Sequence, residues 1–104
     1  MSLIKYKIYK TPEYQEWLEE QLAKAQVQIE DRLSKIETDG YFGTHKHLEN
    51  SLWELKWLNG RRLYYVYIPE KQILLLLGGN KNGQSKDITK AKKIFKKHCD
   101  IIEN

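Results

Sequence analysis

A chain of 104 residues, 40% of them hydrophobic, can bury one core but hardly two, so we expect a single domain over residues 1–104. No apolar run approaches the roughly 18 residues of a membrane span, and the N-terminus lacks the apolar stretch of a secretory signal. These features predict a cytoplasmic protein without a membrane partner, and the single cysteine, Cys99, excludes an internal disulfide.

The net charge of +4 is unevenly distributed along the chain. Residues 11–39 hold eight acidic residues against three basic ones, a net charge of −5, so the rest of the chain carries +9. This asymmetry predicts one surface for a polyanion and another that faces solvent or a basic partner. Two solvated helix faces of opposite sign would give the same pattern.

The N-terminal part of the sequence predicts a strand followed by helices. Alternating residue types indicate a short strand over residues 3–9. Residues 11–13 supply a hydroxyl cap, a proline and an acid, which together are typical of a helix start. Apolar residues then recur every three or four positions to Thr38, and Gly40 ends the pattern. Because this stripe is long for one helix in a small domain, a break near Val27 is expected to give a hairpin of two helices.

The middle of the sequence predicts a β-hairpin after a loop. Residues 39–51 are expected to form the loop. Apolar and polar residues alternate over 52–58, and a second strand is expected over 61–68. The Asn59-Gly60 dipeptide between them is a strong hairpin turn signal.

The four leucines at 74–77 predict a central strand over residues 72–78 that is covered on both faces. The strand leads through Gly78-Gly79 and Lys81 into a helix that Ser85 can cap, an arrangement suited to holding an anion. The apolar stripe of this helix comprises Ile88, Ala91, Phe95, Cys99 and Ile102, and its opposite face carries Lys86, Lys90, Lys92, Lys93, Lys96 and Lys97. The sequence therefore predicts an α+β fold: a small antiparallel sheet with two N-terminal helices and a C-terminal helix.

Several polar groups converge on one side of the predicted sheet. Glu54 and Lys56 leave their strand on the same face, and an arginine across the hairpin joins them. A two-residue loop places Arg61 there, whereas a loop one residue longer places Arg62 there; periodicity leaves this open. Further candidates near this side are His45, Lys46, His47, Tyr65, Lys81, Gln84 and Lys86.

This set of residue types suits a phosphodiester. Arginine and lysine stabilise a phosphate and the charge that develops during attack, a carboxylate or imidazole can accept a 2′-hydroxyl proton, and tyrosine stacks on splayed bases. The sequence contains no two-metal carboxylate cluster, no Walker loop and no standard zinc spacing. The simpler interpretation of Glu54, Lys56 and the arginine is a cross-strand ion pair on a solvated face.

Four segments together resemble the RelE/ParE superfamily, and most closely its HigB-like branch of addiction-module killer proteins. They are RLSKIETDGYFG at 32–43, LWELK at 52–56, RLYY at 62–65 and LLLLGGNKNGQSKDITKA at 74–91. The resemblance spans nearly the whole chain in the right order. It implies the RelE-like arrangement β-α-α-β-β-β-α.

The resemblance also implies a function. It indicates a toxin of a type II toxin–antitoxin system, silenced by a cognate antitoxin that we expect to be of the helix-turn-helix DNA-binding type. Most toxins with this fold cleave mRNA, many of them inside the translating ribosome, whereas the ParE branch poisons DNA gyrase. We therefore expect a ribosome-associated mRNA endoribonuclease that needs neither metal nor cofactor. The alternatives are a gyrase poison without catalysis and an inactive antitoxin-binding protein.

The catalytic residues of the family carry over in part. The family's strand arginine matches Arg62, which favours the longer hairpin loop, and its basic residue after the glycine turn matches Lys81. Lys56 matches a second basic position, but Glu54 stands where some relatives have lysine. The general base therefore stays open between Glu54 and His47. The predicted RNA contacts are Arg61, His45, Lys46, Tyr65, Gln84 and Lys86.

Overall fold

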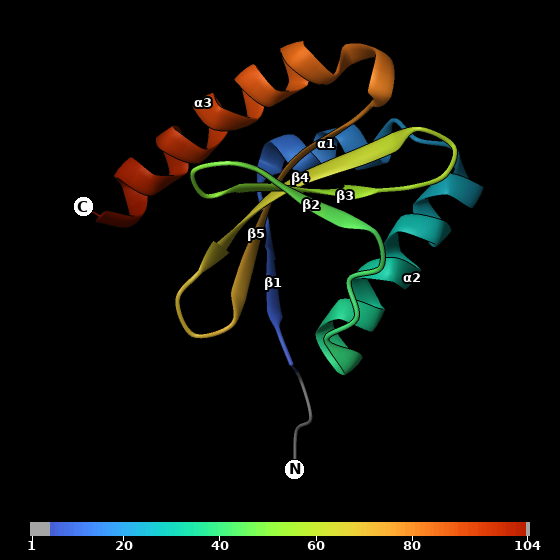
Figure 1. Ribbon diagram of the computed structural model, residues 1–104, viewed down its shortest axis with the longest axis horizontal. Helices are drawn as coiled ribbons and strands as arrows, with labels where there is room; N and C mark the ends of the chain where they lie inside the picture. The colour runs from blue at the N-terminus through green and yellow to red at the C-terminus, as the bar shows by residue number, and fades with distance from the viewer. Residues whose placement is uncertain (1–4, 104) are drawn as a thin grey trace.

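The computed structural model describes residues 5–103, with side chains described as far as Cys99, so the predicted strand residue Leu3 and the side chain of Ile102 lie outside the described part. Figure 1 shows the elements in chain order. They are β1 (Lys7–Lys10), α1 (Pro12–Glu19), α2 (Ala23–Asp39), β2 (His45–Glu49), β3 (Leu52–Lys56), β4 (Arg61–Ile68), β5 (Gln72–Asn80), a short 3₁₀ helix (Lys81–Gly83) and α3 (Gln84–Glu103). Among the described residues, no helix is both long and apolar enough to cross a membrane.

The strands form one five-stranded sheet in the order β1-β5-β4-β3-β2. The predicted α+β fold, with two N-terminal helices and one C-terminal helix, is confirmed. The sheet is mixed rather than wholly antiparallel, because β1 lies parallel to β5 while the other neighbours are antiparallel. A parallel pair requires a long crossover, and the chain from α1 to β4 supplies it.

Strand β2 was not predicted, because residues 39–51 were expected to form a loop. Its sequence, HKHLE, has no apolar alternation, and only Leu48 is even half-buried. It is an edge strand that pairs with β3 alone and carries an irregularity between His47 and Glu49. Such a strand is held by its backbone ladder rather than by apolar burial, and periodicity does not detect it.

The two N-terminal helices are confirmed, but the predicted break near Val27 is wrong. Helix α1 ends at Glu19, α2 begins at Ala23, and Val27 is exposed within α2. Leu22, which was counted in the apolar stripe, is also exposed in the linker. No side chain caps α2, so the sequence carries no start signal at its true beginning.

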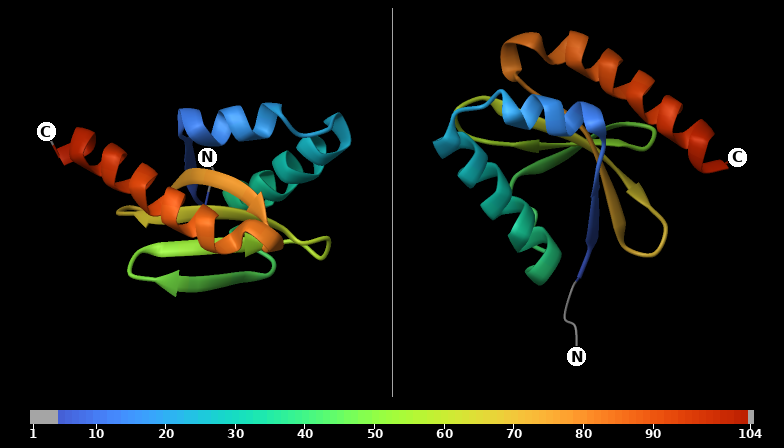
Figure 2. Two further views of the ribbon diagram at one scale, coloured as in Figure 1. Left: turned by 90° about the horizontal axis from the view of Figure 1, so that it is seen from above. Right: turned by 180° about the vertical axis from the view of Figure 1, so that it is seen from behind.

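The core has two parts, one on each face of the sheet. Helices α1 and α2 cover one face and α3 covers the other, as Figures 1 and 2 show. Leu75 belongs to the cluster beneath α1 and α2, whereas Leu74, Leu76 and Leu77 pack beneath α3. The four-leucine strand is therefore covered on both faces, as predicted.

Candidate functional site

The β3–β4 hairpin decides which arginine faces Glu54 and Lys56. Lys56 lies opposite Arg62, and the N–H of Trp57 donates to the carbonyl of Arg61. The loop therefore comprises residues 58–60, the longer of the two alternatives, and Gly60 adopts φ +96° within it. Arg62 thus lies on the Glu54/Lys56 face, as the family resemblance favoured.

Glu54 is buried behind Arg62 rather than open to a substrate. Its side chain is 1% exposed, and its Oε2 lies 3.9 Å from Nε of Arg62, whose side chain is 12% exposed. The side-chain amide of Gln84, in the first turn of α3, donates a hydrogen bond of 2.9 Å to the same Oε2. At its separation of 3.9 Å, beyond hydrogen-bond length, Glu54 attracts the guanidinium of Arg62 electrostatically.

Lys81 lies next to the hairpin turn. It begins the 3₁₀ helix after β5, and its backbone N–H donates to the carbonyl of Gly60 at 2.9 Å. Its aliphatic stem covers Gly60 so closely that a Cβ at residue 60 would lie 3.4 Å from Cγ of Lys81. The fold thereby brings Lys81, far away in sequence, to the end of the β3–β4 hairpin.

Lys56, Arg62 and Lys81 line one cleft of about 810 Å³, which we call the basic cleft. Five basic side chains face a single carboxylate, that of Asp31, and the excess positive charge suits a phosphate-bearing ligand. The lining residues are Gln28, Asp31, Arg32, Lys35, Tyr41, Gly43, Thr44, Lys56, Trp57, Leu58, Asn59, Gly60, Arg62 and Lys81.

Arg32 shapes this cleft but was not among the predicted site residues. Its guanidinium donates to the carbonyls of Phe42, Thr44 and Lys56 and lies 4.3 Å from the ring centre of Trp57. Burial lowers its pKa below the usual value, although a guanidinium stays charged in proteins. Arg32 ties the segment before β2 to the end of β3. The sequence feature that could have identified Arg32 is its position within an otherwise apolar helical stripe, directly before Leu33.

Strand β2 places Lys46 on one face of the sheet and His45 and His47 on the other. Lys46 lies opposite Glu54, whereas His47 lies opposite Trp53, on the other face of the sheet. Nε2 of His47 lies 2.6 Å from the carbonyl oxygen of Asn50. The structure therefore does not bring the imidazole of His47 together with Arg62, and neither predicted general base lines the basic cleft.

Two predicted RNA contacts have structural roles instead. Tyr65 is 1% exposed in the core, and burial raises the pKa of its hydroxyl, so the prediction that it stacks on a base is wrong. Its neighbour on β4, Tyr64, is buried as well. Gln84 contacts Glu54 through its amide and so links α3 to the sheet.

The remaining predicted RNA contacts lie near the surface. Arg61 lies over the ring of Trp57 at 5.5 Å and donates to the side chain of Gln28 at 3.3 Å, while burial lowers its pKa. Lys86 is exposed in the first turn of α3. Ser85, predicted to cap α3, lies inside the helix, and its carbonyl accepts from the hydroxyl of Thr89. The side chain of Asn80 caps the preceding 3₁₀ helix instead.

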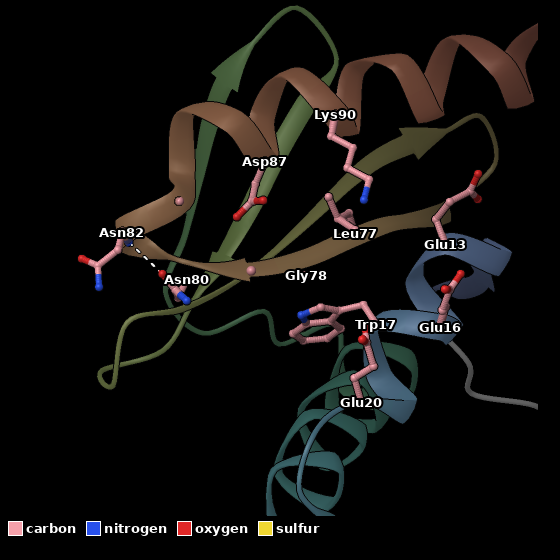
Figure 3. Close-up of a pocket in the computed structure, with 12 residues that line it drawn as sticks. Glu13, Glu16, Trp17, Glu20, Leu77, Gly78, Asn80, Asn82, Asp87 and Lys90 are labelled. Atoms are coloured by element: carbon pink, nitrogen blue, oxygen red, sulfur yellow. Dashed lines mark hydrogen bonds between the residues drawn. The ribbon is translucent and has the colours of Figure 1, made fainter.

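The Gly78-Gly79 segment at the end of β5 does not form the expected anion site on the side that faces α1. A cleft of about 640 Å³ lies there between α1 and α3 (Figure 3). Four carboxylates, from Glu13, Glu16, Glu20 and Asp87, face the single ammonium of Lys90. This acidic cleft would repel a phosphate. Lys81 lines the basic cleft instead.

Gly78 and Gly79 allow the side chains of Trp17 and Asp87 to approach the backbone of β5 closely, one on each side. A Cβ at residue 78 would lie 2.1 Å from the ring of Trp17, and one at residue 79 would lie 2.1 Å from Oδ2 of Asp87. The indole faces Gly78 from α1, and the carboxylate of Asp87 descends from α3 (Figure 3). Within the described part of the chain, no group of three or more histidine, cysteine, aspartate or glutamate side chains could hold a metal ion.

Comparisons with known proteins match residues 16–102 to a family described as phage-derived protein Gp49-like (DUF891). A search of curated proteins finds no match. Solved structures of similar fold include RelBE2, a toxin–antitoxin complex from Mycobacterium tuberculosis, with a TM-score of 0.62 at 12% identity over 74% of this chain and 99% of that chain.

Two Escherichia coli structures are similar as well. The intact RelBE toxin–antitoxin complex gives a TM-score of 0.60 at 17% identity, over 72% of this chain and 95% of that chain. The isolated RelE toxin gives 0.59 at 16% identity, over 81% of this chain and 96% of that chain. At these identities the likeness establishes a common fold.

Proposed function

The chain belongs to the Gp49-like family and has the fold of RelE toxins, and from this premise we propose that it is the toxin of a type II toxin–antitoxin system. We further propose that it acts in the cytoplasm as a ribosome-associated mRNA endoribonuclease. The observation that carries the proposal is the basic cleft, where Lys56, Arg62 and Lys81 meet from three separate segments.

In this proposal the scissile phosphate of an mRNA enters the basic cleft. Lys81 and Arg62 stabilise the negative charge that builds up on the phosphate during attack by the 2′-hydroxyl, and Lys56 assists from the strand opposite Arg62. Glu54 acts through Arg62, because it is buried behind the guanidinium. The attraction of this buried carboxylate keeps the guanidinium close to the sheet, which reduces the reorganisation that reaction requires.

The proposed partners are an antitoxin, the ribosome and mRNA. The structures of RelBE and RelBE2 are toxin–antitoxin complexes, which supports an antitoxin partner for this chain. The predicted helix-turn-helix type of that antitoxin and membership of the HigB-like branch remain proposals. The exposed lysines of α3 are available to the phosphate backbone of rRNA or mRNA.

Primer extension on mRNA from cells expressing the protein without its antitoxin tests this function. We expect growth to stop and new 5′ ends to appear within reading frames. A matched strain expressing Lys81→Ala should show neither effect. DNA breaks linked to gyrase, without mRNA cuts, would instead indicate the poison, and normal growth with soluble protein would indicate an inactive antitoxin-binding protein.

A further inference from the structure

The sheet face opposite α3 carries a group of rings that the basic cleft does not include. Helix α2 covers the inner strands, where Ile29, Leu33 and Ile36 pack against Leu55 and Leu75. Towards the edge strand β2 the rings remain accessible: His45 and His47 are exposed, Tyr67 is 37% exposed and Trp53 is half-buried.

These rings form one continuous surface. The centroid of Trp53 lies 5.0 Å from that of His47 and 5.6 Å from that of His45, and Tyr67 meets Trp53 edge-on at 5.4 Å. Phe42 supports them from below: it is only 8% exposed, and its ring centre lies 5.3 Å from His45 and 5.9 Å from Tyr67. These contacts restrain the rings, whose planes are tilted by 55° to 84° with respect to their neighbours.

Backbone contacts fix the two imidazoles without a ligand. Nδ1 of His45 lies 3.1 Å from the carbonyl oxygen of Gly43, and Nε2 of His47 lies 2.6 Å from that of Asn50. A carbonyl only accepts, so these nitrogens carry the hydrogens. Each ring therefore keeps its second nitrogen for another partner and loses little conformational freedom when one binds.

The carboxylates of β2 and β3 lie away from these rings. Both acidic residues of β2 and β3 are turned towards α3: Glu49 pairs with Lys92, and Glu54 contacts Arg62 and Gln84. These two strands therefore place no carboxylate beside the rings that would repel a phosphate.

The rings also continue the basic cleft. Gly43 and Thr44 line that cleft and lead directly into His45. Trp57, another wall of the cleft, lies four residues beyond Trp53 along the chain, a distance of about 13 Å in extended backbone. Roughly four stacked nucleotides span that distance. One strand of nucleic acid can thus occupy the cleft and the rings together.

We propose that His45, His47, Trp53 and Tyr67 form a stacking platform for the bases of single-stranded RNA whose backbone lies in the basic cleft. The proposal rests on the proposed function, which supplies RNA as the ligand. Aromatic side chains exposed on a sheet face stack on unpaired bases with little sequence preference, because every base has a flat face. The platform thereby holds the RNA strand next to the phosphate that reacts.

Binding of two oligonucleotides measured by fluorescence anisotropy tests the platform. One is a short 2′-O-methyl oligoadenylate, which lacks the hydroxyl needed for cleavage, and the other has the same backbone without bases. The variants are His45→Ala/His47→Ala and Tyr67→Leu. The matched control is Tyr9→Leu, because Tyr9 is 39% exposed on β1 at the other edge of the sheet. Circular dichroism verifies that each variant is folded.

We expect each platform variant to weaken oligoadenylate binding roughly five-fold or more. Binding of the abasic backbone should stay unchanged, and Tyr9→Leu should change neither affinity. Equal losses for both oligonucleotides, or no loss for either, would overturn the platform. Loss of antitoxin binding alone, with oligoadenylate binding intact, would overturn it in favour of a protein interface.

The variant Lys81→Ala separates the platform from the proposed function. One outcome would support the basic cleft and overturn the platform. In it, Lys81→Ala binds the abasic backbone more weakly than the wild type does, and the wild type binds both oligonucleotides with the same affinity. Base-dependent binding that Lys81→Ala does not affect would support the platform and contradict the role of the cleft.

Discussion

Arg62 links the chemistry of the basic cleft to the stability of the sheet. Among the described residues, Arg62 is the only basic residue that forms an ion pair with the buried carboxylate of Glu54. The simpler interpretation of the sequence, an ion pair on a solvated face, is wrong for Glu54, which is 1% exposed. Strand alternation identifies a face of the sheet but not what covers it. Helix α3, distant in sequence, covers that face and buries Glu54.

Replacing Arg62 should therefore affect both stability and activity. Arg62→Ala leaves Glu54 with only Gln84 as a partner, and we expect a loss of roughly 3 kcal/mol in the free energy of unfolding. The double variant Arg62→Ala/Glu54→Gln removes the stranded charge and should recover most of this loss without recovering activity. Urea unfolding and toxicity assays check both expectations. An Arg62→Ala protein as stable as wild type would show that Glu54 does not depend on Arg62.

Lys81 should affect activity alone. The side chain is exposed, so Lys81→Ala should change the free energy of unfolding by no more than about 0.5 kcal/mol. Its loss should remove roughly 2–4 kcal/mol of transition-state stabilisation, by analogy with the loss of one oxyanion donor. Lys24→Ala, which removes the same charge from an exposed position at the start of α2, is the control. Equal RNA cleavage rates for the two variants would contradict the assignment.

At the scale of elements, sequence patterns predicted the buried parts better than the exposed ones. The leucine strand and the β3–β4 hairpin were predicted because apolar burial and turn chemistry leave local signals. The edge strand β2 and the uncapped start of α2 leave none. The residue pattern singled out Lys56 and Lys81, and the family resemblance favoured Arg62 over Arg61. Arg32 was missed because its role depends on backbone carbonyls outside its own helix.

The glycines of β5 determine how closely α1 and α3 approach the sheet. Gly78→Ala places a methyl group inside the ring of Trp17, a large rigid side chain that packs against both core clusters, and should cost roughly 3 kcal/mol of stability. Gly79→Ala meets the end of the Asp87 side chain, which can rotate towards the acidic cleft, so its cost should be smaller. Thermal and urea unfolding of both variants measure the difference. A larger loss for Gly79→Ala would mean that Asp87 is the more rigid of the two contacts.

Glu13 joins α1 to α3 and should make stability depend on pH. Burial alone would raise its pKa, but hydrogen bonds from Lys97 and His98 outweigh burial and lower the pKa from 4.5 to about 2. The carboxylate therefore contributes fully above about pH 4.5, and its contribution is lost as the pH falls towards 2. Glu13→Gln should lower stability at pH 7 by about 1–2 kcal/mol, after allowance for solvent screening, and flatten this acid dependence.

Urea unfolding between pH 7 and pH 2 measures this effect. Glu16→Gln, which removes an exposed carboxylate one turn further along α1, is the matched control. An acid dependence that is the same for both variants would show that the contacts of Glu13 with α3 contribute no stability.

At the scale of the whole molecule, the charge asymmetry of the sequence becomes two clefts of opposite sign. Glu13 and Glu16 of α1 and Glu20 just after it line the cleft beside Gly78. Arg32 and Lys35 belong to the acidic segment of the sequence but line the basic cleft. The charge distribution along the chain predicted a surface for a polyanion, and the packing of α2 beside the β3–β4 hairpin determines where the proposed surface lies.

The most direct test of the central proposal uses purified ribosomes carrying a defined mRNA. Wild-type protein and Lys81→Ala are added separately, and primer extension maps the 5′ ends. We predict that the wild-type protein cuts ribosome-bound mRNA, and that Lys81→Ala cuts it at least roughly 30-fold more slowly. Intact mRNA after incubation with folded wild-type protein, or equal cutting by the two proteins, would contradict the assignment of the basic cleft as a ribonuclease site.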